Sequence, residues 1–236
     1  EPIGDEILIV TDTKENVISD GVHYVGDPDP HADYPDKMVT DFIEFNEETG
    51  RYDPILSVED LIRYEGCSIR IGGKRGLRMV TSIGQDFKNR LVKEGIEVNG
   101  VVYKLDSYGT LMAWTDELAG RELTIELVSA GVARMGTAYE AAGKKDNILT
   151  RSGGREYWCN VVTSEDGTFT DEQVCDDMTL RAFVKLVGAN GQTLYIYDGS
   201  VVRSIGYVAV QNADEYAAGT WQYDAIQEFI EMYKKA

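Results

Sequence analysis

The chain is poor in the residues on which nucleophilic and metal chemistry depend. Its 236 residues include two histidines, His23 and His31, and three cysteines, Cys67, Cys159 and Cys175. No CxxC motif occurs, so the sequence gives no basis for a zinc site or a thioredoxin-like redox pair. A Cys–His pair or a His-rich metal site would have to use the N-terminal segment. These shortages argue against a nucleophilic triad.

Basic residues and long apolar runs are also scarce. The chain carries 23 Lys and Arg against 41 Asp and Glu, a formal net charge of -18. Nucleic acid and anionic membranes bind clustered Lys and Arg, so neither is expected as a partner. No stretch approaches the ~20 apolar residues that span a bilayer, so membrane insertion is not expected. The start at Glu1, without Met or signal-peptide regions, is what a mature or excised fragment would show.

Alternating apolar residues dominate after about residue 67 and predict strands joined by turns. The best hairpin covers 180–197, where Gly-Ala-Asn-Gly separates two alternating runs. Further strands are expected at 6–10, 40–45, 67–71, 77–83, 98–105, 108–114, 122–128 and 157–163. Helices are expected at 57–66, 84–95, 115–120 and 223–235.

This pattern predicts a β-rich α+β fold. We expect an antiparallel β-sandwich or barrel with a few short peripheral helices and a C-terminal helix. Residues 1–60 are expected to form an N-terminal segment with short strands and an acidic, Pro-rich loop. Residues 61–236 are expected to form the sandwich module with its C-terminal helix.

Three motifs together resemble a known module. "GLRMVTSI", "YGTLMAW" and "RAFVKL…VVRSIGYVA" occur in that order, with a helix between the first two. They are similar to a β-rich module that recurs in secreted, multi-domain, dockerin- or adhesin-associated cell-surface proteins of anaerobic Gram-positive bacteria. The resemblance covers roughly residues 65–212. It departs from the pattern at Met79, Phe183 and Ile205, where the module usually has an aromatic residue, Tyr and Val. The resemblance implies an extracellular or cell-surface-attached setting and a β-rich fold, and it implies no catalytic residue.

Basic side chains interrupt the apolar stretch "IRIGGKRGLRMVTSI" at 69–83. Strand parity places Arg78 and Arg181 opposite the core-facing residues, and Arg203 lies in a comparable β-segment. Two interpretations remain open: a shared positive binding patch, or separate arginines paired with carboxylates beneath a helix or the N-terminal segment. Pairing is favoured, because Arg buries well when it is paired.

Other candidate residues have a structural alternative each. Phe183, Tyr195, Tyr197 and Trp158 are candidates for an aromatic face on which a sugar stacks, although core packing is the usual role of such residues. Cys159 and Cys175 are candidates for a disulfide, with two free thiols as the equal alternative.

The acidic loop "DPDPHAD" offers a third candidate. Asp27, Asp29 and Asp33 are possible calcium ligands. The EF-hand pattern is absent, so a solvated loop without a cofactor is favoured.

The expected function is a non-catalytic extracellular surface module. Adhesion, carbohydrate binding and presentation of neighbouring domains are the candidate roles, with a glycan or another surface protein as partner. The alternatives are an extracellular glycan hydrolase that uses a carboxylate pair, or a purely structural spacer.

Overall fold

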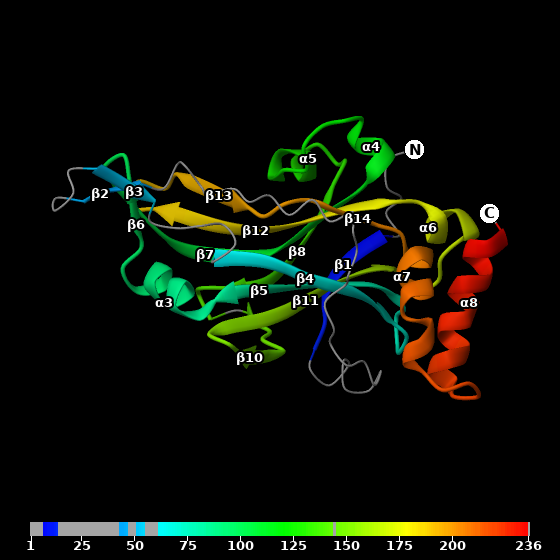
Figure 1. The fold of residues 1–236 in the computed structure, drawn as a ribbon. Coiled ribbons are helices and arrows are strands. Elements are labelled where there is room, and N and C mark those ends of the chain that lie inside the picture. Colours follow the sequence, from blue (N-terminus) through cyan, green and yellow to red (C-terminus); the bar gives the residue numbers. More distant parts are fainter. Residues whose placement is uncertain (1–6, 14–42, 47–50, 55–60, 144, 236) are drawn as a thin grey trace.

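The computed structural model describes residues 7–13, 43–46, 51–54, 61–143 and 145–235. Within them, two antiparallel sheets pack face to face, with helices at the two ends and over one outer face (Figure 1). The β-rich antiparallel sandwich with a few short helices and a C-terminal helix is therefore confirmed.

The first sheet, sheet 1, has the strand order β1-β11-β5-β4, and β10 pairs with β11. Its strands are β4 (Ile62–Arg70), β5 (Gly76–Gly84), β11 (Arg155–Ser164), β1 (Ile7–Thr11) and β10 (Thr150–Ser152). All nine residues of β5 are buried, because this strand is central in the sheet and covered on both faces. The strands predicted at 67–71 and 77–83 are confirmed, and they pair as the β4–β5 hairpin.

The second sheet, sheet 2, has the order β13-β12-β7-β8-β9, with β14 paired to β12 and β6 to β7. Its strands are β6 (Ile96–Val98), β7 (Val101–Trp114), β8 (Arg134–Glu140), β9 (Lys145–Asp146), β12 (Met178–Gly188), β13 (Thr193–Tyr197) and β14 (Val201–Arg203). The predicted 180–197 hairpin is confirmed as β12–β13. A separate two-stranded ladder joins β2 (Ile43–Asn46) to β3 (Arg51–Pro54).

Strand β1 closes one side of the sandwich. It pairs with β11 in sheet 1, and the Thr11 hydroxyl donates to the Thr137 carbonyl of β8 at 2.8 Å. A Cβ on Gly136 would lie 2.2 Å from Ile9 Cγ2, so only glycine allows this close approach. Ile7–Thr11 is therefore a strand of sheet 1.

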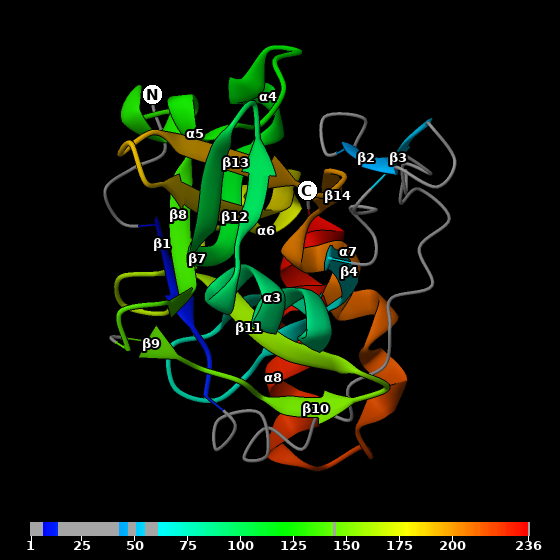
Figure 2. The same ribbon diagram turned by 90° about the vertical axis from the view of Figure 1, so that its left-hand side faces the viewer.

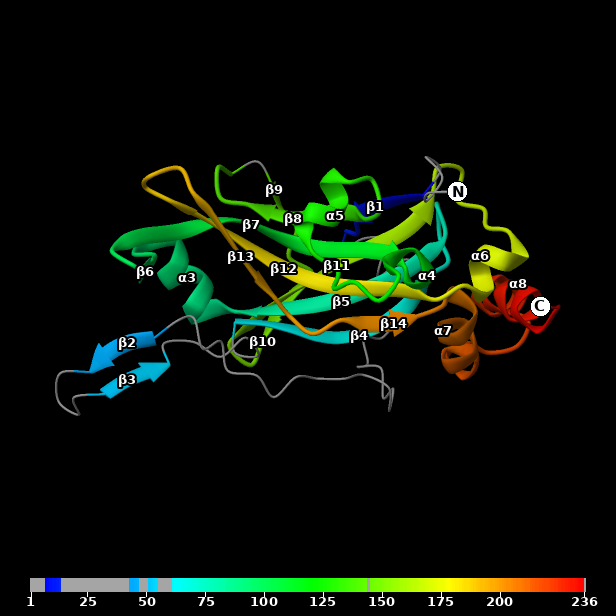
Figure 3. The same cartoon turned by 90° about the horizontal axis from the view of Figure 1, so that it is seen from above.

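Helices cover the ends of the sandwich and one outer face. In Figure 2, α3 lies close to the ends of β7 and β11, and in Figure 3, α4 and α5 lie above β7 and β12. The helices are α3 (Gln85–Lys93), α4 (Thr115–Leu118), α5 (Ile125–Ser129), α6 (Asp171–Cys175), α7 (Ile205–Gln211) and α8 (Trp221–Lys235), with a 3-10 turn at Ala213–Glu215. None of the helices in the described ranges is long and apolar enough to cross a membrane.

Two expected elements differ from the structure. The second half of the helix expected at 57–66 is the start of β4, because Ile62 and Tyr64 pair with β5 and are buried. The strand expected at 122–128 contains α5 instead, and Leu127 packs with Phe183 in a small apolar cluster over sheet 2. In both segments tertiary contacts override the local pattern.

Candidate functional site

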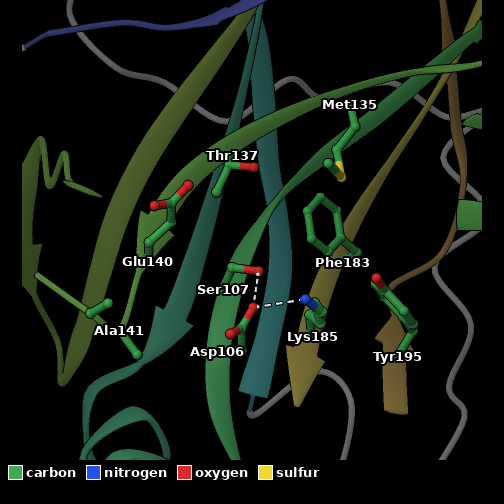
Figure 4. A pocket seen from close by; sticks show the side chains of 10 residues that line it. Asp106, Ser107, Met135, Thr137, Glu140, Ala141, Phe183, Lys185 and Tyr195 are labelled. Carbon is green, nitrogen blue, oxygen red and sulfur yellow. Dashed lines mark hydrogen bonds and ion pairs between the residues drawn. The ribbon is translucent and has the colours of Figure 1, made fainter. Parts of the chain in front are cut away.

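A pocket of about 310 Å³ opens on the outer face of sheet 2 (Figure 4). It lies beside the part of this face that α4 and α5 cover. Side chains from four neighbouring strands and the turn after β8 line it: Asp106, Ser107, Met135, Thr137, Glu140, Ala141, Ala142, Phe183, Lys185 and Tyr195.

Strand parity explains the aromatic side of the pocket. In β12, Ala182 and Val184 face the core between the sheets, so Phe183 and Lys185 face outward. The β12–β13 register places Tyr195 opposite Lys185 and Tyr197 opposite Phe183. One face of this hairpin therefore carries three aromatic rings beside a lysine.

Two register shifts bring the carboxylates to the pocket. Lys185 pairs with Ser107 and Leu186 pairs with Leu105, so Asp106 is an extra residue in β7. A similar shift in β8 leaves Ala138 without a partner in the β7–β8 register. Bulges of this kind re-aim side chains and often lie next to functional sites. Here they allow Asp106 and Ser107 to line the pocket together, with Glu140 beside them.

Gly109 limits the bulk on this face. It pairs with Phe183 in β12 and with Thr137 in β8. A Cβ at this position would lie 1.9 Å from the Gly136 carbonyl oxygen. The bulged backbone therefore requires glycine, and no side chain fills the space between Phe183 and Thr137.

The polar groups of the pocket form one neutral pair and one separate carboxylate. The Lys185 ammonium lies 3.0 Å from Asp106 Oδ2, and the Ser107 hydroxyl donates to the same oxygen at 3.1 Å. Glu140 forms no ion pair with any residue that the structure describes. Figure 4 shows Glu140 on one side of the pocket and Met135, Phe183 and Tyr195 on the other.

The three aromatic residues have different roles. Phe183 is almost completely buried and forms part of the floor. Tyr197 is held by α5, because its hydroxyl accepts a hydrogen bond from the Ile125 amide at 3.0 Å; burial raises the pKa of Tyr197. The Tyr195 ring stacks on Tyr197, with centroids 6.1 Å apart, and it is the half-buried ring that lines the pocket.

The three predicted arginines do not form a shared patch. Arg78 faces outward from sheet 1 and is fully buried against Asp12, with contacts of 2.7 and 2.8 Å. Arg181 faces outward from sheet 2, where it pairs with Glu122 at 2.7 Å and lies 4.6 Å from the Tyr197 ring centroid. The sandwich separates these two arginines. The favoured interpretation, carboxylate pairing, is confirmed for both.

Arg203 corrects the expectation of a non-core position. It pairs with Met178 in the β14–β12 register, so it faces the same side as this core residue. Its guanidinium lies 5.7 Å from the centroid of the Tyr64 ring. The exposed residue of β14 is Val202, which shows that the parity of this short strand is opposite to the one expected.

Trp158 is not available for sugar stacking. It is 1% exposed, lies between the sheets and packs against Tyr108 with ring centroids 4.5 Å apart. Its indole N–H donates to Asn160 Oδ1 at 3.2 Å. Trp158 therefore packs in the core, which was the alternative to sugar stacking for this residue.

The cysteines are all free, so the structure has the thiol alternative and no Cys159–Cys175 disulfide. Cys159 is buried within sheet 1, whereas Cys175 lies on α6 beside the Tyr233 carbonyl of α8. The two residues belong to different layers, which sequence spacing could not reveal. Burial raises the pKa of the Cys159 thiol and makes it unreactive.

The possible calcium ligands Asp27, Asp29 and Asp33 lie outside the described residues. Among the residues that are described, no group of three or more His, Cys, Asp and Glu side chains is placed to hold a metal ion.

A second group of charged residues fastens α3 to the sandwich. The buried Lys88 ammonium donates to Glu156 at 2.5 Å and lies 4.4 Å from the Tyr139 ring centroid. Arg151 also donates to Glu156, at 2.9 Å. Burial raises the pKa of Tyr108, which stacks on Tyr139. Lys88 and Glu156 satisfy each other, and we interpret the group as structural.

Several residues of the pocket were not singled out from the sequence. Asp106, Glu140 and Thr137 belong to strands whose alternation is interrupted, and a change of apolar parity between Leu105 and Tyr108 is the one signal of a bulge.

Comparisons with models of known protein families, with curated proteins and with solved structures found no match.

Proposed function

We propose that the chain is a non-catalytic glycan-binding module of an extracellular or cell-surface-attached protein. The observation that carries the proposal is the outer-face pocket, which combines an accessible aromatic ring with carboxylate, ammonium and hydroxyl groups. Attachment to glycans would make the module an adhesion element or a means of presenting neighbouring domains. The resemblance to surface modules supports the setting.

The chemistry of the pocket suits a sugar ring. The C–H face of a pyranose packs on aromatic and apolar surface, here Tyr195 and the 43%-exposed Met135. Sugar hydroxyls both donate and accept hydrogen bonds. Asp106 offers acceptors, Lys185 offers donors, and the Thr137 hydroxyl can donate and accept. A small number of polar groups beside an apolar wall is typical of pockets that bind small ligands.

Binding to a panel of neutral oligosaccharides, measured by isothermal titration calorimetry, tests this proposal. Tyr195→Ala should lower affinity by about tenfold or more, about 1.4 kcal/mol, because it removes the stacking surface. Trp221→Ala is the matched control, since Trp221 is a 51%-exposed aromatic residue on α8, outside the pocket. Equal losses in both variants, or no binding of any glycan, would contradict the proposal.

A glycan hydrolase is the second candidate, because Asp106 and Glu140 line the same pocket. Carboxylate pairs are the usual catalytic groups of glycoside hydrolysis. The ion pair of Asp106 with Lys185 favours binding instead, because this carboxylate already contacts the ammonium at 3.0 Å. Release of reducing sugar that is lost in Glu140→Gln would favour the enzyme; failure in both assays would favour a structural spacer.

The extracellular setting has its own test. The precursor of the protein should carry an export signal upstream of Glu1, and fractionation should recover it outside the cell or on its surface. A precursor without an export signal would contradict this part of the proposal.

A further inference from the structure

Building on the proposed glycan binding, we propose that the pocket prefers glycans with unsubstituted amino groups, and that Glu140 binds the sugar ammonium. The inference depends on the proposed function and names the chemical class of its ligand. It follows from the balance of charges in and around the pocket.

The pocket has one more carboxylate than it has cations. The Lys185 ammonium contacts Asp106 at 3.0 Å, so these two charges largely cancel. Glu140 is half-buried and has no ion-pair partner among the described residues. Lys145 stands opposite Glu140 in the β8–β9 register but does not form an ion pair with it. A ligand cation at this side of the pocket would therefore gain a partner without displacing one.

The surroundings reinforce this preference. The nearest arginine along the outer face of β12, Arg181, is engaged by Glu122 and by the carbonyls of Asp198 and Leu123. The whole chain carries a formal net charge of -18, which attracts cations and repels acidic sugars over long range. Uronic and sialic acids would bring a further carboxylate next to Glu140, at a cost in affinity.

The apolar wall makes the ligand a sugar rather than a free amine. Tyr195 and Met135 lie on the side of the pocket away from Glu140 (Figure 4). A pyranose ring that rests on this wall carries its equatorial substituents in the ring plane, so a ring edge that is turned toward Glu140 brings one substituent to that side of the pocket. An amino substituent in this position meets the Glu140 carboxylate, whereas an N-acetyl group is neutral and bulkier.

Two tetrasaccharides provide the test: glucosamine tetramer and N-acetylglucosamine tetramer, which differ only in N-acetylation. Titrations at about pH 5.5 keep the sugar amines protonated. The glucosamine tetramer should bind about tenfold more tightly, and the preference should shrink as salt rises from about 0.05 to about 0.5 M.

Glu140→Gln should reduce the preference to about twofold or less while binding of the N-acetylated tetramer stays nearly the same. Glu97→Gln is the matched control, because it removes the same charge from an exposed site on β6; it should leave the preference intact. Equal affinities for the two tetramers, or an unchanged preference in Glu140→Gln, would overturn the inference and leave glycan binding standing. Absence of binding by both tetramers overturns the inference, and absence of binding by every glycan overturns the proposed function as well.

Discussion

At the scale of single residues, the basic side chains at 69–83 connect other parts of the chain to sheet 1. Arg78 and Arg70 lie 2.7 and 3.8 Å from the two carboxylate oxygens of Asp12, which follows β1. Arg75 pairs with Glu228 of α8 and lies 5.0 Å from the Phe229 ring centroid. An acidic chain thus uses its few cations to attach β1 and α8 to the sandwich.

Asp12→Asn should lower the free energy of unfolding by about 3 kcal/mol or more, because it removes the carboxylate that pairs with the fully buried Arg78. Urea unfolding at neutral pH measures the change. Glu228→Gln makes the same carboxylate-to-amide change at a 62%-exposed side chain, so it should cost less than about 1 kcal/mol. Similar small effects in both variants would show that the buried pair contributes little.

At the scale of secondary-structure elements, a buried lysine joins α3 to sheet 1, in addition to the apolar packing of Phe87 and Leu91. Lys88 reaches from the helix to Glu156 of β11 and is only 6% exposed. Burial alone would raise the pKa of Glu156, but hydrogen bonds from Lys88 and Arg151 outweigh it and lower the pKa. The ionised carboxylate therefore stabilises the folded state.

The stability contributed by Glu156 should depend on pH. With its folded pKa lowered, the contribution is fully present above the unfolded value of about 4.3 and is lost as pH falls through the folded pKa. Glu156→Gln should cost about 3 kcal/mol at pH 7, and the gap from the unmodified protein should narrow below about pH 4. Urea unfolding across this pH range measures the difference in stability, with Glu97→Gln as the control. A difference that does not change with pH would contradict the stabilising role of the ionised Glu156.

The contact between α7 and α8 depends on Gly206. A Cβ at this position would lie 2.2 Å from Tyr233 Cδ2 and 2.6 Å from Tyr233 Cβ. Gly206→Ala should therefore destabilise the protein by about 1–3 kcal/mol. At an exposed helical position the same change would instead stabilise the protein by about 1 kcal/mol. The sign of the change in stability therefore shows whether the two helices pack closely at Gly206.

Thermal unfolding of Gly206→Ala, Tyr233→Ala and the double variant measures this contact. The second change removes the ring atoms at 2.2 and 2.3 Å but keeps the Cβ atom, so it should relieve part of the clash and the two costs should not add. Strict additivity, or a stabilised Gly206→Ala, would mean that the helices do not pack this closely.

At the scale of the whole molecule, the two ends of the sandwich are occupied and one outer face is partly open. Helix α3 lies at one end and α6, α7 and α8 lie at the other (Figure 1). On the outer face of sheet 2, the α4–α5 segment covers Leu111 and Ala113, while the pocket lies beyond it. The arrangement leaves the pocket open on this face.

Folding should not require a metal ion. The acidic loop with Asp27, Asp29 and Asp33 lacks the EF-hand spacing of ligands, so EDTA should leave the melting temperature unchanged. Differential scanning calorimetry with and without EDTA measures this. A drop of several degrees that calcium reverses would instead indicate a calcium site in this loop.

The sequence by itself determined the elements in which period and turn chemistry agree. Alternation and glycine-rich turns located the β4–β5 and β12–β13 hairpins, and the 3.6-residue period located α3 and α8. Parity then placed Phe183 and Lys185 on one face of β12, because successive side chains on a regular strand point to opposite sides. These features depend on interactions between residues that are close together in the sequence.

Only the tertiary structure decided the rest of the site. The bulges at Asp106 and Ala138 depend on pairing with neighbouring strands, and they shift parity in a way that local alternation cannot fix. Trp158 has a ring of the kind on which sugars stack, but it lies between the sheets. Arg203 faces inward because the β12–β14 register pairs it with Met178. A pocket made from four strands exists only when sheet order and register bring its residues together, since those contacts join residues far apart in the chain.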